Sequence, residues 1–163
     1  MTLPDRISNV DIVELGRSLF GNVMVRQVVQ KNMLSINRRA GIYFINLQSR
    51  GQRSWDGMTN GTHWTVLLVM PGAYYYFDSF GFMPPEVVER KLQGFDETWN
   101  QDCVQPVESD LCGFYCLMAM NELLNNDGVV DMNGSILRRN GRKLFTANIK
   151  NNDKLVRRFK NSL

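Results

Sequence analysis

The sequence predicts an α+β domain, with a small mixed or antiparallel sheet flanked by helices. Runs of β-branched and aromatic residues, typical of strands, alternate with segments whose apolar residues have helical spacing. The chain has 163 residues, of which 44% are hydrophobic and 21% charged, a composition typical of a globular domain with its own core. No repeat, low-complexity tract or long linker divides the sequence. We therefore treat residues 1–163 as a single domain.

The first third of the chain predicts two helices and a buried strand. Ser8, with Asp11 three residues later, precedes an apolar segment and is typical of a capped helix start. Residues 22–34 are expected to hold a second short helix. Residues 42–47 are β-branched and aromatic, which predicts a buried strand, and the polar, glycine-rich residues 48–61 predict a loop.

The middle of the chain predicts a β-hairpin followed by a helix. Residues 62–70 and 73–80 are strand-like, and the turn-forming dipeptide Pro71-Gly72 joins them. Pro84-Pro85 precedes a short apolar segment, which predicts a helix with proline in its first turn.

The last part of the chain predicts a short strand and a buried helix. Residues 102–105 are expected to form a strand that Pro106 stops. Residues 112–124 have the apolar spacing of a mostly buried helix, and the polar residues 125–128 end it.

The cysteine and histidine content argues against metal and disulfide staples. Three cysteines, an odd number, and the absence of a leader-like N-terminus predict reduced thiols in a cytosol-like compartment. The chain has no CxxC pair and a single histidine, so we expect no structural metal site. The longest apolar run, residues 66–70, is far too short to cross a bilayer. We therefore expect a protein that is not secreted and has no membrane partner.

Positive charge is concentrated at the C-terminal end. The net charge of the whole chain is +3, but residues 135–163 contain nine basic residues and one acid, Asp153, which gives this segment a charge of +8. The remainder carries −5. A basic end on an acidic body could bind a polyanion such as DNA. We favour a solvated, amphipathic terminal helix, because charge patterning alone is weak evidence.

Three residues could form a catalytic cysteine site. His63, the only histidine, begins one predicted strand, and Asp78 lies near the end of the next. These two ends meet in an antiparallel hairpin, and the separation of 15 residues leaves room for two strands and a tight turn. Cys112 begins the buried helix, where the helix dipole and the unpaired backbone N–H groups stabilise a thiolate.

Two neighbouring residues could assist the same chemistry. Gln105 precedes Cys112 by seven residues, across a loop that contains proline. Its side-chain amide could join the Cys112 N–H in an oxyanion hole. Trp64 could wall one side of the His63 imidazole and exclude water.

Each of these residues also has a purely structural interpretation. A cysteine at the head of an apolar helix is more often a small core residue, and we expect Cys103 and Cys116 to be core residues of this kind. Asp78 could cap a turn, and Gln105 could be an ordinary loop residue. The joint order and local contexts of the residues, rather than any one of them, favour catalysis.

The same residues carry a resemblance to a known family. His63-Trp64, Asp78 within Phe77-Asp78-Ser79-Phe80-Gly81, Gln105, and Cys112-Gly113-Phe114-Tyr115-Cys116-Leu117 resemble the adenain family of cysteine peptidases. This family shares a clan with the proteases of ubiquitin-like modifiers. The match looks closest to the maturation proteases of virophages, Polinton-like elements and large DNA viruses. It extends over residues 61–124, about two fifths of the chain.

The resemblance implies an adenain-like fold and a role for each residue. Cys112, at the N-terminus of its buried helix, would be the nucleophile, His63 the general base and then the acid, and Asp78 the group that orients the imidazole. Gln105 and the Cys112 N–H would form the oxyanion hole, and Trp64 with Gly113 would line the substrate groove. Adenovirus enzymes carry glutamate at the acid position, so aspartate resembles the modifier proteases and the virophage type more closely.

The resemblance also implies substrates, partners and location. Adenain-like enzymes prefer glycine before the cut, often paired glycines, because a narrow groove excludes side chains. The substrates would be viral capsid or core precursors, and the protein would work in the host cytoplasm or nucleus, at a viral factory, and be packaged in the virion. The chemistry needs no cofactor, but adenain is activated by a viral peptide, for which Cys103 is a candidate attachment point, and by DNA. The residues expected to contact DNA are Arg138, Arg139, Arg142, Lys143, Arg157 and Arg158.

Four hypotheses therefore follow from the sequence. The leading one is a viral cysteine endopeptidase that cleaves precursors during virion maturation. A deubiquitinase or modifier protease would have the same site with a different groove. The clan's acetyltransferase branch has no additional support. An inactive nucleic-acid-binding or scaffold domain is a different class, and retention of every catalytic group argues against it.

Overall fold

The computed structural model describes residues 2–22, 24–47 and 63–163. Its helices are α1 (Asn9–Phe20), η1 (Lys31–Met33, a 3₁₀ turn), α2 (Glu86–Lys91), α3 (Cys112–Asn125) and α4 (Ile149–Asn161). Its strands are β1 (Val25–Gln30), β2 (Gly41–Asn46), β3 (Trp64–Met70), β4 (Ala73–Phe77), β5 (Asp96–Trp99), β6 (Val129–Val130) and β7 (Ile136–Leu137).

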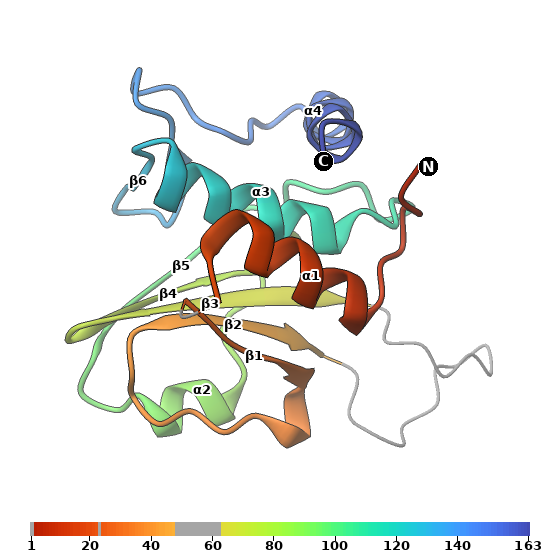
Figure 1. Cartoon of the computed structure of the whole chain (residues 1–163). Helices are drawn as coiled ribbons and strands as arrows, with labels where there is room; N and C mark the ends of the chain where they lie inside the picture. The colour runs from red at the N-terminus through yellow and green to blue at the C-terminus, as the bar shows by residue number, and fades with distance from the viewer. Residues whose placement is uncertain (1, 23, 48–62) are drawn as a thin grey trace.

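The first five strands form one mixed sheet, in the order β1-β2-β3-β4-β5. The central pairs β2-β3 and β3-β4 are antiparallel, whereas the outer pairs β1-β2 and β4-β5 are parallel. In Figure 1, α1 and α3 cover one face of this sheet, α4 lies outside α3, and α2 covers the other face. The predicted α+β class, a small mixed sheet flanked by helices, is therefore confirmed.

Each face of the sheet has its own hydrophobic core. Along β3, Val66 and Leu68 pack with the cluster under α1 and α3, while Leu67 and Val69 pack with the cluster over α2. Strands covered on both faces read as continuous apolar runs rather than as alternating ones. Composition was therefore enough to predict the strands at residues 42–47 and 62–70. Residue 62 and the predicted loop 48–61 lie outside the described residues.

The helix predicted over residues 22–34 is wrong. The chain forms β1 there, followed by the 3₁₀ turn η1. Val25, Val28 and Val29 are β-branched, and they pair in parallel with Ile42, Phe44 and Ile45 of β2. Pairing with β2 therefore decides the conformation of this segment.

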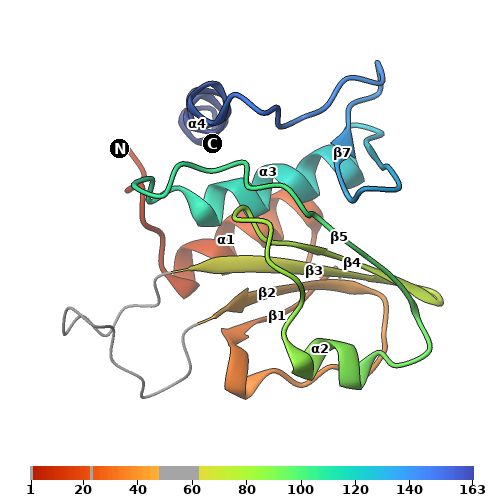
Figure 2. The same ribbon diagram turned by 180° about the vertical axis from the view of Figure 1, so that it is seen from behind.

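The strand predicted over residues 102–105 is also wrong. This segment is an irregular loop, in which the backbone N–H groups of Val104 and Gln105 both donate to the Ser79 carbonyl, at 2.8 and 3.3 Å. The strand that borders β4 is β5, at the edge of the sheet (Figure 2). The β5 sequence Asp-Glu-Thr-Trp is polar because an edge strand is partly solvated, and its composition therefore gave no strand signal.

The remaining helix predictions are confirmed. Ser8 caps α1 in a capping box: its hydroxyl accepts from Asp11 N at 3.2 Å, and the Asp11 carboxylate accepts from Ser8 N at 2.9 Å. Pro85 is the N-cap of α2, and Asn126 ends α3. The C-terminal segment contains the amphipathic helix α4, whose Val156 is fully buried. In the described part of the chain, no helix is long and apolar enough to span a membrane.

Candidate active site

The β3-β4 hairpin brings His63 and Asp78 together. His63 directly precedes β3 and Asp78 directly follows β4, and the register Val66↔Phe77 places these two strand ends side by side. His63 Nε2 lies 2.7 Å from Asp78 Oδ1. The contact expected from the hairpin is therefore present in the structure.

The surroundings of Asp78 hold its carboxylate in one orientation. Asp78 is fully buried, and its Oδ1 also accepts a hydrogen bond from the Phe80 N–H at 2.8 Å. The Asn100 amide donates to the Asp78 carbonyl at 2.8 Å. The Phe80 ring stacks on the His63 imidazole with centroids 4.7 Å apart. Phe80 thus shields one face of the imidazole, and the expectation that Trp64 walls a side of the ring stays a prediction.

Cys112 lies on the other side of His63. It is the first residue of α3 and is 7% exposed, and its Sγ accepts a hydrogen bond from Trp64 N at 3.4 Å. Asp78 occupies Nε2 of the imidazole, so an exchange of a proton with the Cys112 sulfur would have to use the buried Nδ1. The N-terminus of α3 adds its positive end to the same place.

The electrostatics of the site favour a charged imidazole. Burial lowers the pKa of His63, but hydrogen bonding to Asp78 and to Cys112, together with their negative charges, outweighs burial and raises this pKa from 6.5 to about 9. At neutral pH the ring is therefore mostly an imidazolium.

The raised pKa of His63 predicts a pH-dependent stability. The folded chain keeps the His63 proton up to about pH 9, whereas the unfolded chain releases it near 6.5. The stabilisation is therefore fully present below pH 6.5 and is lost as the pH rises through 9, by roughly 3 kcal/mol at 1.36 kcal/mol per pH unit. Urea unfolding between pH 6 and 10 measures this fall. The double variant His63→Gln/Asp78→Asn, which carries neither charge, should lack it; an equal fall in both proteins would contradict the assignment.

The other two cysteines have different environments. Cys116 lies one turn along α3 and is fully buried, and its thiol donates to the Trp64 carbonyl at 3.3 Å. Burial, and then the negative charges of Cys112 and Asp78, raise the pKa of the Cys116 thiol well above its usual value. Cys103 is exposed, so the prediction that it is a core residue is wrong: it lies in an irregular loop and not in a buried strand.

Gln105 is held by hydrogen bonds at both ends of its amide. It is 1% exposed, its Oε1 accepts from Ser79 Oγ at 2.5 Å, and its Nε2 donates to the Ser109 carbonyl at 2.8 Å. These partners use one of the two Nε2–H groups and leave the second available. The loop that contains Gln105 leads directly into Cys112. The oxyanion role of Gln105 remains a prediction.

The two residues expected to line the groove are covered by the N-terminal segment. Trp64 is 2% exposed, and its indole N–H donates to the Ile7 carbonyl at 3.2 Å. Ile7 also lies on Gly113, where an added Cβ would approach two Ile7 side-chain carbons to 2.7 Å. A cavity of about 310 Å³ lies beside Trp64 and is bordered by residues 6–10 and Asn46. The groove role of Trp64 and Gly113 stays a prediction.

Sequence reasoning missed four residues around this site. Ser79 and Phe80 follow Asp78 directly, so their proximity was available as a signal. Ile7 and Asn100 reach the site from distant parts of the chain, and nothing in their local sequence indicates this.

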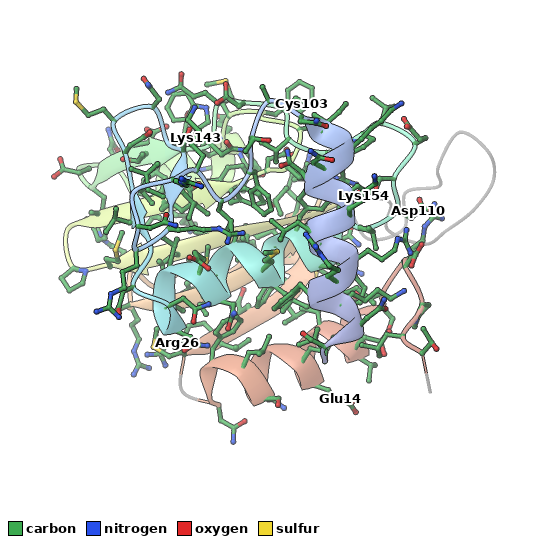
Figure 3. The ribbon with its side chains drawn as sticks, turned by 90° about the horizontal axis from the view of Figure 1, so that it is seen from above. Glu14, Arg26, Cys103, Asp110, Lys143 and Lys154 are labelled. Carbon is green, nitrogen blue, oxygen red and sulfur yellow. The ribbon has the colours of Figure 1, made fainter. Side chains whose placement is uncertain are left out.

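The basic residues expected to contact DNA fall into two groups. The first group follows β7 in the chain and comprises Arg138, Arg139, Arg142 and Lys143, and the second lies on α4 and comprises Arg157 and Arg158. Figure 3 labels one lysine from each of these two regions, Lys143 and Lys154. Arg157 forms a bidentate ion pair with Asp5, at 3.0 and 3.1 Å, and the Asp5 carboxylate therefore partly neutralises its positive charge.

The fold and this constellation together define an α+β domain with a cysteine, a histidine and an aspartate in one series of contacts. No family model matches the sequence, and no curated protein shows significant similarity to it. The solved structures that are similar include two crystal structures of the ASFV pS273R protease, one of them of its selenomethionine form. Both are 16% identical to this chain and match 77% of it. The selenomethionine form has a TM-score of 0.46 with 62% of its own length matched, and the other structure has a TM-score of 0.48 with 61% matched. The chain therefore spans about three fifths of the length of these proteases.

Proposed function

We propose that this chain is a viral cysteine endopeptidase that hydrolyses peptide bonds in capsid or core precursors. The observation that supports it best is the 2.7 Å bond between His63 Nε2 and the fully buried Asp78, next to Cys112 at the head of α3. A nucleophile, a base and a group that orients the base are the minimum that this chemistry requires.

The residues act in two steps. In the first, the Cys112 thiolate attacks the scissile carbonyl carbon, a C–S bond forms, and the carbonyl oxygen becomes an oxyanion that the Cys112 N–H and the Gln105 amide stabilise. The His63 imidazolium then gives its proton to the leaving amine, and the C–N bond breaks. In the second step, the neutral imidazole takes a proton from water, whose oxygen attacks the thioester carbon and releases the acid and the Cys112 thiolate.

The substrate preference rests on the resemblance to adenain-type proteases. We expect cleavage after glycine, often after paired glycines, in precursors that are assembled into the virion. The protease would act at the viral factory, in the host cytoplasm or nucleus, and be packaged with its substrates. A viral peptide is a further candidate activator.

The test is direct digestion. The full chain is incubated with recombinant capsid precursors and, in parallel, with ubiquitin and modifier conjugates, and new N-termini are mapped by mass spectrometry. Cuts after glycine in the precursors support the proposal, whereas cuts in conjugates alone would favour a modifier protease. Alkylation supplies an independent readout, since Cys112 should react faster than Cys103 or Cys116. Equal rates, with no cleavage of any substrate, would favour an inactive scaffold domain.

We also propose that duplex DNA is an activating partner, because exposed cations gather on α4 and around β7. The rate of peptide cleavage should rise with DNA at low salt and lose this gain at higher salt, as phosphate contacts do. The double variant Arg142→Gln/Arg158→Gln should need more DNA for the same gain, whereas Arg17→Gln on α1 should not. Equal rates with and without DNA at every salt concentration would remove DNA from the scheme.

A further inference from the structure

The single acidic residue of the basic C-terminal segment, Asp153, binds the loop that precedes Cys112. It lies in the first half of α4 and is half-buried. Its Oδ1 accepts two hydrogen bonds, from Ser109 Oγ at 2.6 Å and from the Tyr115 hydroxyl at 3.1 Å. Tyr115 belongs to α3, whereas Ser109 belongs to the loop between Gln105 and Cys112. Asp153 therefore ties this loop to two helices.

Ser109 connects Asp153 to Gln105. Its hydroxyl donates to Asp153 and accepts from Leu111 N at 3.3 Å, while its carbonyl accepts from Gln105 Nε2 at 2.8 Å. Ser109 N donates to the Pro106 carbonyl at 3.0 Å, which closes a turn. The carbonyl that holds the Gln105 amide therefore lies in a turn whose position is fixed by a carboxylate on α4.

The preceding residue of α4 holds the other side of Gln105. Asn152 is 2% exposed, and its Nδ2 donates to the Val104 carbonyl at 3.0 Å and to the Thr146 carbonyl at 2.7 Å. Two adjacent residues of α4 thus hold the loop on both sides of Gln105: Asn152 binds Val104, and Asp153 binds Ser109. Figure 3 looks down on α4 where it crosses α3.

The orientation of the Gln105 amide matters because only its NH₂ end can donate to an oxyanion. Ser79 Oγ donates to Oε1 and the Ser109 carbonyl accepts from Nε2, so the two partners together specify which end of the amide faces which way. If the Ser109 turn moves, the Ser79 hydroxyl still contacts the amide, but a hydroxyl can donate or accept, so this contact alone does not distinguish Oε1 from Nε2.

We infer that Asp153 is a positioning residue for the Gln105 amide, which it orients through Ser109. This inference rests on the proposed function in so far as Gln105 donates to the oxyanion. It assigns to α4 a part in the chemistry, although no atom of α4 would touch the substrate.

A merely structural anchor would have a different signature. Loss of a helix-packing contact lowers the thermal transition and impairs all activities of Cys112 together. Loss of an oriented oxyanion donor lowers kcat more than it changes KM and leaves simple alkylation of the thiolate intact, because alkylation forms no oxyanion.

The kinetic test compares three variants of the full chain on a glycine-containing peptide. Asp153→Ala should lower kcat by about 10- to 100-fold, less than complete loss of one oxyanion donor, with KM within about twofold. The affinity for a peptide aldehyde should fall in parallel, while the rate of Cys112 alkylation by iodoacetamide stays unchanged. Asp153→Asn keeps an acceptor oxygen and should restore most of kcat. Tyr115→Phe removes the other hydrogen bond of Asp153 and should remain close to native.

A spectroscopic test applies whether or not the chain is a protease. In ¹⁵N-labelled protein, the Gln105 side-chain amide resonance should shift or broaden in Asp153→Ala and in Ser109→Ala, but not in Tyr115→Phe. An unchanged resonance, or a parallel fall of kcat, alkylation rate and thermal transition, would overturn the inference. If the native chain cleaves nothing while the resonance still responds, the proposed function fails and the positioning of Gln105 by Asp153 stands.

Discussion

Replacement of Cys112 by alanine is expected to abolish peptide hydrolysis while the fold is retained. The change removes the sulfur that forms the bond to the scissile carbon in the proposed mechanism, and removal of a catalytic nucleophile costs on the order of 10⁶ in kcat. The structural loss should be small, because the hydrogen bond that Sγ accepts from Trp64 N is long, at 3.4 Å. We expect the thermal transition to stay within about 4 °C of the native value, which for a chain of this size corresponds to roughly 1 kcal/mol.

The other two cysteines provide the matched controls. Cys103→Ala changes an exposed side chain and should leave rate and stability as they are. Cys116→Ala removes a fully buried sulfur one turn from Cys112, so it should lower stability and still allow cleavage. Cleavage is followed with a fluorogenic glycine-containing peptide, and unfolding by circular dichroism. Measurable turnover by Cys112→Ala, or none by Cys103→Ala, would show that the nucleophile has been assigned wrongly.

The parts of the site that sequence could predict are those fixed by local geometry. His63 precedes the first strand of one hairpin and Asp78 follows the second, so both lie at its open end, and their contact follows from strand register alone. Cys112 begins a long apolar helix, and a helix start can be recognised in the sequence. In each case the partner elements are neighbours in the chain, so tertiary context had little to override.

The parts that sequence could not predict depend on distant contacts. β1 is a strand because it pairs with β2, and β5 is a strand because it borders β4, although its own residues are polar. Ile7 covers Gly113 from more than 100 positions away, and Asp153 reaches Ser109 across 44. Asp153 appeared in the sequence only as the exception in a basic segment, and its role becomes visible when α4 is placed over the loop.

The second large effect is expected from Asp78→Asn, which should lower kcat by up to about 10⁴-fold, the loss known for this change of the orienting carboxylate in a catalytic triad. Asparagine has nearly the same shape, and its oxygen can still accept from Phe80 N. The substitution removes, however, the negative charge of Asp78, which counteracts the lowering of the His63 pKa by burial. Since Asp78 is the first of the groups that raise the pKa of His63, this pKa should fall from about 9.

The fall in the His63 pKa has a direction that a pH profile detects. Native cleavage requires the imidazolium, so its rate should decline as the pH rises through about 9. In Asp78→Asn the maximal rate should be lower, and the alkaline limb of the profile should also move to lower pH. The measurement is kcat/KM between pH 5 and 10 on the same fluorogenic peptide.

Asp102→Asn is the matched control, because it removes a carboxylate from the neighbouring loop, where the Asp102 side chain is exposed. It should leave both the rate and the alkaline limb in place. If Asp78→Asn retained a rate within threefold of native and an unmoved limb, a different group would have to orient His63. The fully buried carboxylate of Asp78 would then serve only to cap the turn through Phe80 N.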